Sequence, residues 1–264
     1  MHVAALYSSP VKSLALNRHK EARVTPTGIE GDRAFYIIDE AGRLMTQREC
    51  GALALVRAEY DASSEHLRLV FPDGMEARGP AETGEVMPTR FFHLEREALA
   101  VGGPFADALS AYAGQPLRLV KAMPGKGFDN LAISILSEAS LDRLRSVAGS
   151  AALALNERRF RPNFLIAGAA EPHEEDSWIG KTVRIGGVAV RVVMRDPRCV
   201  MTTLDPDTGK QDLPTLKLIA SYRTDQQKEV NFGVYADVER PGAVHIGDNV
   251  QVVAAGAVAG RDAV

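Results

Sequence analysis

The sequence predicts an α+β fold that is mostly β, with a barrel or sandwich core and a few peripheral helices. Short apolar segments separated by Gly and Pro turns recur along the chain, whereas segments with helical periodicity are few. This pattern is not that of a doubly wound parallel sheet. With 264 residues, 45% of them hydrophobic, the chain is long enough for one large domain or two small ones.

The predicted strands are short apolar segments bounded by turn residues. Gly186-Gly187, between two of these segments, is a strong hairpin signal. In chain order, the predicted strands cover residues 3–11, 33–39, 67–71, 90–94, 116–120, 163–168, 183–187, 189–194 and 248–254.

Helices are predicted for residues 104–114, 137–149 and 213–223. The first has a proline in its first turn, an apolar face and a glycine stop. The second has Ser137 as N-cap and Gly149 as C-cap, with an apolar stripe between them. The third follows a proline.

The charge and the cysteine content of the chain argue against several classes of function. A net charge of −3 argues against nucleic-acid binding, which needs a strongly basic surface. The N-terminus has no basic leader, and no stretch reaches about 18 apolar residues, so we expect a cytoplasmic protein with no membrane partner. Cys50 and Cys199 are too far apart for a CxxC motif, and we expect both to be free thiols.

Common catalytic and metal-binding motifs are missing. The six histidines lack zinc-site spacing, and no GxSxG motif occurs. Residues 124–130, "PGKGFDN", are either a surface connection or a loop that exposes N–H groups to an anion. The acidic residues of 171–176 predict a solvated turn, because clustered like charges usually remain hydrated.

Cys199 lies between an apolar strand and a turn. A free cysteine there is commonly a small buried hydrophobe. However, Arg195 and Arg198 favour the thiolate, and Asp-Pro at 196–197 is a poor continuation of a strand. A thiolate at such an edge is a nucleophile or a soft metal ligand, and the residues alone leave these alternatives open.

Several separated motifs together resemble the MOSC family, named after the C-terminal domain of molybdenum cofactor sulfurase. In chain order they are "SPVKSL", "GIEGDRAFYIID" with "MTQRE", "SILSEASLDRL", "RFRPNFLIAG" with "EEDSWIG", "RCVMTTLDPDTG", "NFGVYADV" and "GAVHIGDNV". The chain is most similar to the branch of amidoxime-reducing components and their bacterial relatives. The resemblance covers nearly the whole chain.

The resemblance implies a MOSC β-barrel core with peripheral helices, preceded by a β-rich region. It divides the chain into a MOSC N-terminal β-barrel region (1–116), a MOSC domain (117–254) and a flexible tail (255–264). It also implies a molybdenum cofactor held by molybdopterin, with Cys199 as the catalytic cysteine and metal ligand. A soft thiolate suits a metal that already has dithiolene sulfur ligands.

By the same resemblance, further residues bind the cofactor. Arginine and lysine suit its phosphate, and asparagine suits the edge of a heterocycle. The implied cofactor-binding residues are Lys12, Ser13, Arg33, Asp129, Asn130, Arg161, Asn163, Arg198 and Tyr235.

The implied activity is the reduction of N-hydroxylated compounds, such as amidoximes, hydroxylamines and N-hydroxylated base analogues, to amines or amidines. No cysteine follows Cys199, so electrons are expected from a separate flavoprotein or ferredoxin-type reductase. Position 197 is a proline, whereas the amidoxime-reducing relatives tend to have a small polar residue there. We expect this difference to affect the range of substrates. The alternative is a persulfide or molybdenum-cofactor carrier that works with a separate desulfurase. No side chain is clearly the proton donor, and Asp196 is a candidate.

Overall fold

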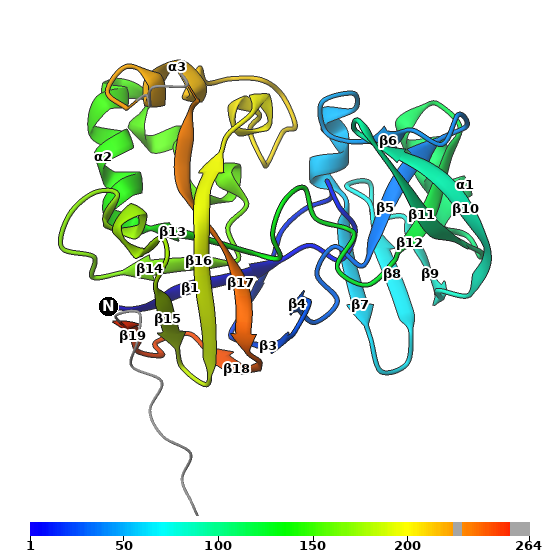
Figure 1. Ribbon diagram of the computed structural model, residues 1–264. Coiled ribbons are helices and arrows are strands. Elements are labelled where there is room, and N and C mark those ends of the chain that lie inside the picture. The colour runs from blue at the N-terminus through cyan, green and yellow to red at the C-terminus, as the bar shows by residue number, and fades with distance from the viewer. Residues whose placement is uncertain (224–228, 254–264) are drawn as a thin grey trace, which may run out of the picture.

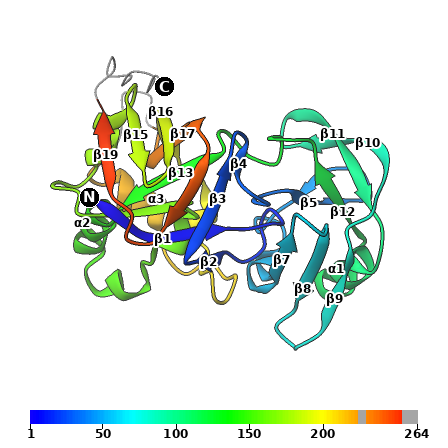
Figure 2. The same ribbon diagram turned by 90° about the horizontal axis from the view of Figure 1, so that it is seen from below.

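The computed structural model describes residues 1–223 and 229–253, which form two lobes side by side (Figures 1 and 2). The large lobe contains strands β1 to β4, within residues 2–29, and the described part of 133–253, and the small lobe contains residues 35–122 together with the connection around residues 11–14. Strands predominate and helices are few, which confirms the mostly β α+β fold. The predicted tail, 255–264, lies outside the described residues.

An eight-stranded sheet forms most of the large lobe. Both faces are buried, because neighbouring side chains of β1 and β13 enter different core clusters on its two sides. Its strand order is β19 (Val250–Val253), β15 (Thr182–Ile185), β16 (Val188–Pro197), β17 (Asn231–Arg240), β13 (Ile133–Ser137), β14 (Phe164–Ala167), β1 (His2–Ser8) and β2 (Asn17–His19).

The predicted barrel is not closed among the described residues. The strand order ends at β19 and β2, and β1 meets the start of β19 only through a short contact. This contact consists of the His2–Asn249 bridge and main-chain hydrogen bonds of Met1 and Val3 to residues 247–250, at 2.8–3.0 Å. A separate three-stranded sheet supplies Val24, Ile29 and Val244 to the same core cluster, so it covers the core where the larger sheet does not close. Its order is β18 (Gly242–His245), β3 (Glu21–Thr25) and β4 (Gly28–Ile29).

Two sheets form the small lobe around a core that they share with one helix. The first has the order β10 (Thr83–Phe91), β11 (Leu94–Val101), β12 (Leu117–Ala122), β5 (Phe35–Asp39) and β6 (Leu44–Met45). The second is β7 (Arg57–Asp61), β8 (His66–Val70) and β9 (Glu76–Pro80). Strand pairing therefore places β1–β4 with the C-terminal strands and β12 with the small lobe.

The helices follow their capping signals. Helix α1 (Phe105–Ala113) ends at Gly114 in the left-handed region, and α2 (Glu138–Ala148) begins at Ser137, whose side chain accepts a hydrogen bond from the Ser140 N–H. The remaining helical elements are short: α3 (Thr215–Ala220), η1 (Gly51–Leu55), η2 (Gly149–Ala154), η3 (Glu157–Phe160), η4 (Glu174–Trp178) and η5 (Val200–Thr203). Among the described residues, no helix is both long enough and apolar enough to cross a membrane.

The connection from β1 to β2 ties the lobes together. Val11 and Leu14 enter the core of the small lobe, although β1 and β2 belong to the large lobe. The Lys12 N–H donates to the carbonyl of Phe35 at 2.8 Å, which fixes this connection to β5. Its intervening residues, Lys12 and Ser13, are thereby held at the boundary between the lobes.

Two local predictions were wrong. Residues 90–94 are not one strand: Arg90 and Phe91 end β10, Leu94 begins β11, and Phe92 and His93 form the turn between them, with Phe92 at φ 56°. The acidic turn is not fully solvated, since the side chain of Glu175 is completely buried. Its carboxylate accepts hydrogen bonds from the hydroxyls of Ser137 and Ser140 at 2.7 and 2.6 Å, which compensates for its burial.

Candidate active site

Cys199 lies two residues after the end of β16, as the N-cap residue of η5, and is half-buried. The strand is irregular before it, with a register shift between Arg195 and Pro197. The Arg198 N–H donates to the Val230 carbonyl at 2.7 Å, so the chain is anchored next to the thiol. The sulfur is thus presented at the end of a rigid strand, at the edge of a cavity.

This cavity has a volume of about 110 Å³ and adjoins a second one of about 200 Å³. The two share Arg159, Arg161 and Met201 in their walls. The first is lined by nine of the ten predicted site residues: Lys12, Ser13, Arg33, Asp129, Arg161, Asn163, Arg198, Cys199 and Tyr235. Asn130 does not line it and is exposed.

Lys12 and Asp129 form an ion pair across the cavity. Burial lowers the pKa of Lys12, and the nearby charges of Arg33 and Arg161 act in the same direction, although Asp129 opposes them. Burial alone would raise the pKa of Asp129, but the charge and hydrogen bond of Lys12, together with the charges of Arg33 and Arg48, outweigh it, so that the pKa of Asp129 is lowered. The ion pair favours the charged form of both groups.

Arg33 is held by a buried carboxylate that sequence reasoning missed. Asp32 pairs with Arg33 and also accepts hydrogen bonds from the Ser9 N–H at 2.7 Å and from the Asn163 amide at 2.8 Å. Asn163 in turn donates to the Tyr7 carbonyl at 3.2 Å and accepts from the Ser134 N–H at 3.0 Å. Both donors of the Asn163 amide are thus used within the protein, where they orient Asp32.

Arg161 has no carboxylate oxygen within 4.0 Å among the described residues. Its guanidinium donates to the Leu14 carbonyl at 2.8 Å. Burial and the charge of Arg33 lower the pKa of Arg161 to about 9, although the nearby charges of Asp32 and Asp129 oppose this shift. Because neither carboxylate contacts the half-buried guanidinium, this part of the cavity is suited to an anionic ligand.

Left-handed backbone conformations concentrate at this site. Ser13, Arg33 and Arg161 have φ values of 72°, 49° and 51°, and all three line the cavity. Such conformations are unfavourable for residues other than glycine and typically occur where a site requires them. The backbone therefore holds these three residues in the cavity wall in conformations that are energetically unfavourable.

Arg198, the residue before Cys199, is anchored to neighbouring segments by its side chain. Its guanidinium donates to the carbonyls of Phe232 and Phe160, both at 2.7 Å, and pairs with Asp196 at 2.6 Å. Asp196 is buried and also accepts from the Ser134 hydroxyl at 2.9 Å and from Tyr235. Burial raises the pKa of Asp196 to about 6 and raises that of Tyr235 as well.

Arg48 is the cavity-edge residue that the sequence analysis did not select, although it belongs to the "MTQRE" motif. It comes from the small lobe, and its Nη2 lies 3.0 Å from the Sγ of Cys199. The guanidinium also stacks over Phe92, with Cζ 4.8 Å from the ring centroid. Residues 151 positions apart thus meet at the reactive sulfur.

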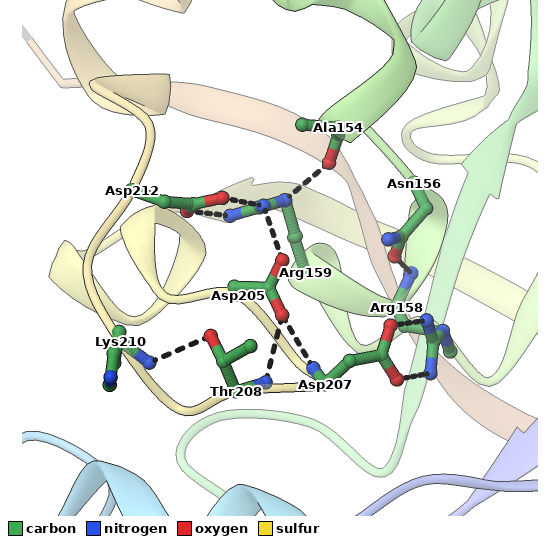
Figure 3. A network of polar contacts seen from close by, with 9 residues as sticks. All are labelled: Ala154, Asn156, Arg158, Arg159, Asp205, Asp207, Thr208, Lys210 and Asp212. Atoms are coloured by element: carbon green, nitrogen blue, oxygen red, sulfur yellow. Dashed lines mark hydrogen bonds and ion pairs between the residues drawn. The ribbon is translucent and has the colours of Figure 1, made fainter.

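A second network shapes the loop that follows η5 (Figure 3). The fully buried Arg159 pairs with Asp212 through two hydrogen bonds, at 2.7 and 2.6 Å. Asp205 accepts from the N–H groups of Asp207 and Thr208 at 2.7 and 2.9 Å, as a turn-forming aspartate does. This network fixes the "DPDTG" turn beside the second cavity.

The described residues contain no group of three or more His, Cys, Asp or Glu side chains that could hold a metal ion. The half-buried Cys199 thiol is a single soft sulfur at the edge of the cavity. The buried cations beside it are suited to an anionic group such as a phosphate.

Comparison with known proteins agrees with this arrangement. The model of the MOSC domain matches residues 124–251, and that of the MOSC N-terminal beta barrel domain matches residues 1–116. Mitochondrial amidoxime-reducing component 1 of Homo sapiens is 32% identical over 288 residues, covering 95% of this chain and 82% of the relative. The chain belongs to the MOSC family.

Other MOSC relatives match over similar lengths. Mitochondrial amidoxime reducing component 2 of Homo sapiens is 29% identical, covering 94% of this chain and 82% of the relative. Among solved structures, the YUAD protein from Bacillus subtilis aligns with a TM-score of 0.45 at 16% identity, covering 95% of this chain and 93% of the other.

Proposed function

We propose that this MOSC protein is a molybdenum-cofactor-dependent reductase of N-hydroxylated compounds, with Cys199 as the protein ligand to the metal. The single observation that carries the proposal is the half-buried Cys199 thiol at the edge of a cavity whose wall contains Arg161, a half-buried guanidinium that no carboxylate of the described residues contacts. The names of the amidoxime-reducing relatives support the reaction class.

The residues present fit a phosphorylated pterin that carries a metal on dithiolene sulfur. Lys12, Arg33 and Arg161 would hold the phosphate by charge-assisted hydrogen bonds. Ser13 lines the same wall, and Tyr235 lies beside Asp196. Cys199 would contribute a soft ligand that matches the dithiolene sulfurs.

When bound, this cofactor supplies the redox chemistry that a protein side chain cannot. The N–O bond of the substrate breaks, and its oxygen leaves as water after taking up two electrons and two protons. The electrons come from a separate flavoprotein or ferredoxin-type donor. The hydroxyl of Tyr235 donates a hydrogen bond to Asp196, whose raised pKa of about 6 makes this pair a candidate for holding a proton beside the cavity.

The test is the molybdenum and pterin content of protein expressed in a host that makes the cofactor. We expect about one molybdenum per chain in the wild type and loss of the metal, or an altered metal spectrum, in Cys199→Ser. Cys50→Ser is the matched control, because Cys50 packs against the small-lobe core. Loaded wild type should then reduce an amidoxime with an artificial electron donor.

Metal-free protein in both the wild type and the variant would contradict ligation by Cys199. A persulfide on Cys199 without bound metal would instead support a sulfur carrier that works with a desulfurase. Mass spectrometry of the intact protein, before and after reduction, distinguishes this second outcome.

A further inference from the structure

Arg48 is held over the sulfur by a rigid loop between β6 and η1. Glu49 accepts hydrogen bonds from both the N–H and the hydroxyl of Thr46 at 2.8 Å, and the Thr46 hydroxyl accepts from the Arg48 N–H at 3.1 Å. Gln47 donates to the Ser13 carbonyl at 2.7 Å. The loop therefore fixes the backbone of an exposed arginine next to the cavity.

The side chain of Arg48 keeps most of its donors available. Apart from the 3.0 Å contact of Nη2 with Cys199, its guanidinium makes no hydrogen bond to a described residue and has no carboxylate oxygen within 4.0 Å there. A guanidinium carries five N–H donors in one plane. The donors that do not point at the sulfur are available to an oxygen atom placed beside it.

Phe92 supplies an apolar surface beside these donors. It lies at the tip of the β10–β11 hairpin, and 37% of its surface is exposed. The ring packs edge-on against Phe91, with centroids 5.4 Å apart, and stacks with Arg48. Phe92 has φ 56°, which is unfavourable for a bulky residue. This conformation places its ring between two residues of the site, since Arg48 contacts Cys199 and Lys12, 5.9 Å from the ring centroid, lines the cavity.

The charge around this edge is positive. Arg48 supplies this charge, because its guanidinium has no carboxylate oxygen within 4.0 Å among the described residues. Lys12 pairs with Asp129 and, with Arg33 and Arg161, is assigned to the cofactor phosphate. A cationic ligand is therefore repelled, while a neutral ligand with a hydrogen-bond-accepting oxygen is not.

We propose that Arg48 and Phe92 form the substrate-recognition edge of this site and select neutral, flat N-hydroxylated compounds, above all aromatic amidoximes. Arg48 donates to the oxygen of the N–OH group, and Phe92 stacks on the aromatic ring of the substrate. An amidine product is protonated at neutral pH, so the positive edge favours its release. This inference rests on the proposed reductase function and deepens it.

The first experiment compares kcat and KM for benzamidoxime and for the small aliphatic acetamidoxime in molybdenum-loaded enzyme. We expect Phe92→Ala to raise KM for benzamidoxime about 3- to 10-fold and to leave acetamidoxime nearly unchanged, which is the range of an aromatic contact. Phe92→Asn, which tolerates the left-handed backbone, repeats the test if the alanine variant folds poorly. Leu94→Ala, on the same hairpin and 43% exposed, is the control.

For Arg48, we expect Arg48→Gln to lower kcat/KM for both amidoximes about 10- to 100-fold, with partial rescue in Arg48→Lys. Arg118→Gln, an exposed arginine of β12 in the small lobe, is the matched control. Molybdenum content must be unchanged in all variants, because neither residue is placed among the cofactor ligands.

A binding measurement without turnover separates recognition from catalysis. In calorimetric titrations, Arg48→Gln should weaken binding of the neutral, unreactive O-methylbenzamidoxime and strengthen binding of the cationic benzamidine. The proposal would be overturned if Phe92→Ala changed KM equally for the aromatic and the aliphatic substrate. It would also be overturned if Arg48→Gln weakened the binding of both ligands. Loaded wild type that reduces no amidoxime would refute the proposed function instead, and the titrations would still decide whether Arg48 and Phe92 recognise the ligand.

Discussion

The backbones of Gly51 and Gly209 meet where the small lobe contacts the large lobe: a Cβ atom on Gly51 would lie 2.0 Å from the carbonyl oxygen of Gly209. Gly51 follows the loop that carries Arg48, and Gly209 ends the turn that Asp205 organises. This contact therefore sets the distance between the two sides of the site.

Gly51→Ala should force these two segments apart. We expect a loss of about 1–3 kcal/mol in the free energy of unfolding, as for other overpacked contacts. The separation should also weaken retention of molybdenum, because residues from both sides define the cavity. Urea unfolding and metal content measure the two effects. Gly79→Ala is the control, since a Cβ there meets nothing within 4 Å, and an equal loss in both variants would contradict the role of the contact.

Removing the charge of Arg161 should separate stability from cofactor retention. Arg161→Gln is expected to leave the melting temperature of the cofactor-free protein unchanged or higher, because an unpaired buried charge is removed. Its cofactor content should nevertheless fall.

Arg33→Gln is the contrasting variant. It leaves the buried Asp32 without its ion-pair partner, and we expect it to destabilise the cofactor-free protein by about 3–5 kcal/mol. Thermal unfolding of the two cofactor-free variants makes the comparison. An equally large destabilisation by Arg161→Gln would show that Arg161 is a structural residue and not a ligand-binding one.

Asp196 should make stability depend on pH in the acid range. Its folded-state pKa of about 6 lies above the ordinary aspartate value of 3.8, so the folded state holds the proton more tightly. The stabilisation is therefore complete below about pH 4 and is lost as the pH rises through 6, by about 3 kcal/mol at roughly 1.4 kcal/mol per pKa unit.

Urea unfolding at several pH values checks this prediction. The difference in unfolding free energy between wild type and Asp196→Asn should decrease from pH 4 to pH 7. Asp237→Asn, at an exposed position of β17, controls for the general effect of removing a carboxyl group. A difference that stays constant over this range would rule out the raised pKa.

Glu175 should be a strong determinant of large-lobe stability. Glu175→Gln replaces one acceptor oxygen with a donor group facing the hydroxyls of Ser137 and Ser140, and we expect a loss of about 1–3 kcal/mol. Equilibrium unfolding measures it. Glu171 is an exposed acidic residue of the same segment, so Glu171→Gln should have almost no effect. Similar losses of stability in both variants would contradict the stabilising role of the buried Glu175 carboxylate.

Much of the fold could be predicted because its determinants are local. The caps Ser137, Gly149 and Gly114 mark the ends of two helices, and alternating apolar segments mark many of the strands. Strand β17 was missed, although it is ten residues long, because its polar positions and Gly233 interrupt the apolar pattern. The motifs of the sequence by themselves determined the family and selected nine residues that line one cavity.

Only the tertiary structure decided what these residues do there. Which arginine has a carboxylate partner depends on contacts between distant segments: Arg33 has Asp32, Arg198 has Asp196, and Arg161 has none among the described residues. The contact of Arg48 with Cys199 likewise arises where two lobes meet, and no local pattern contains it. Burial and charge pairing depend on the whole fold, whereas capping and strand alternation depend on neighbours in the chain.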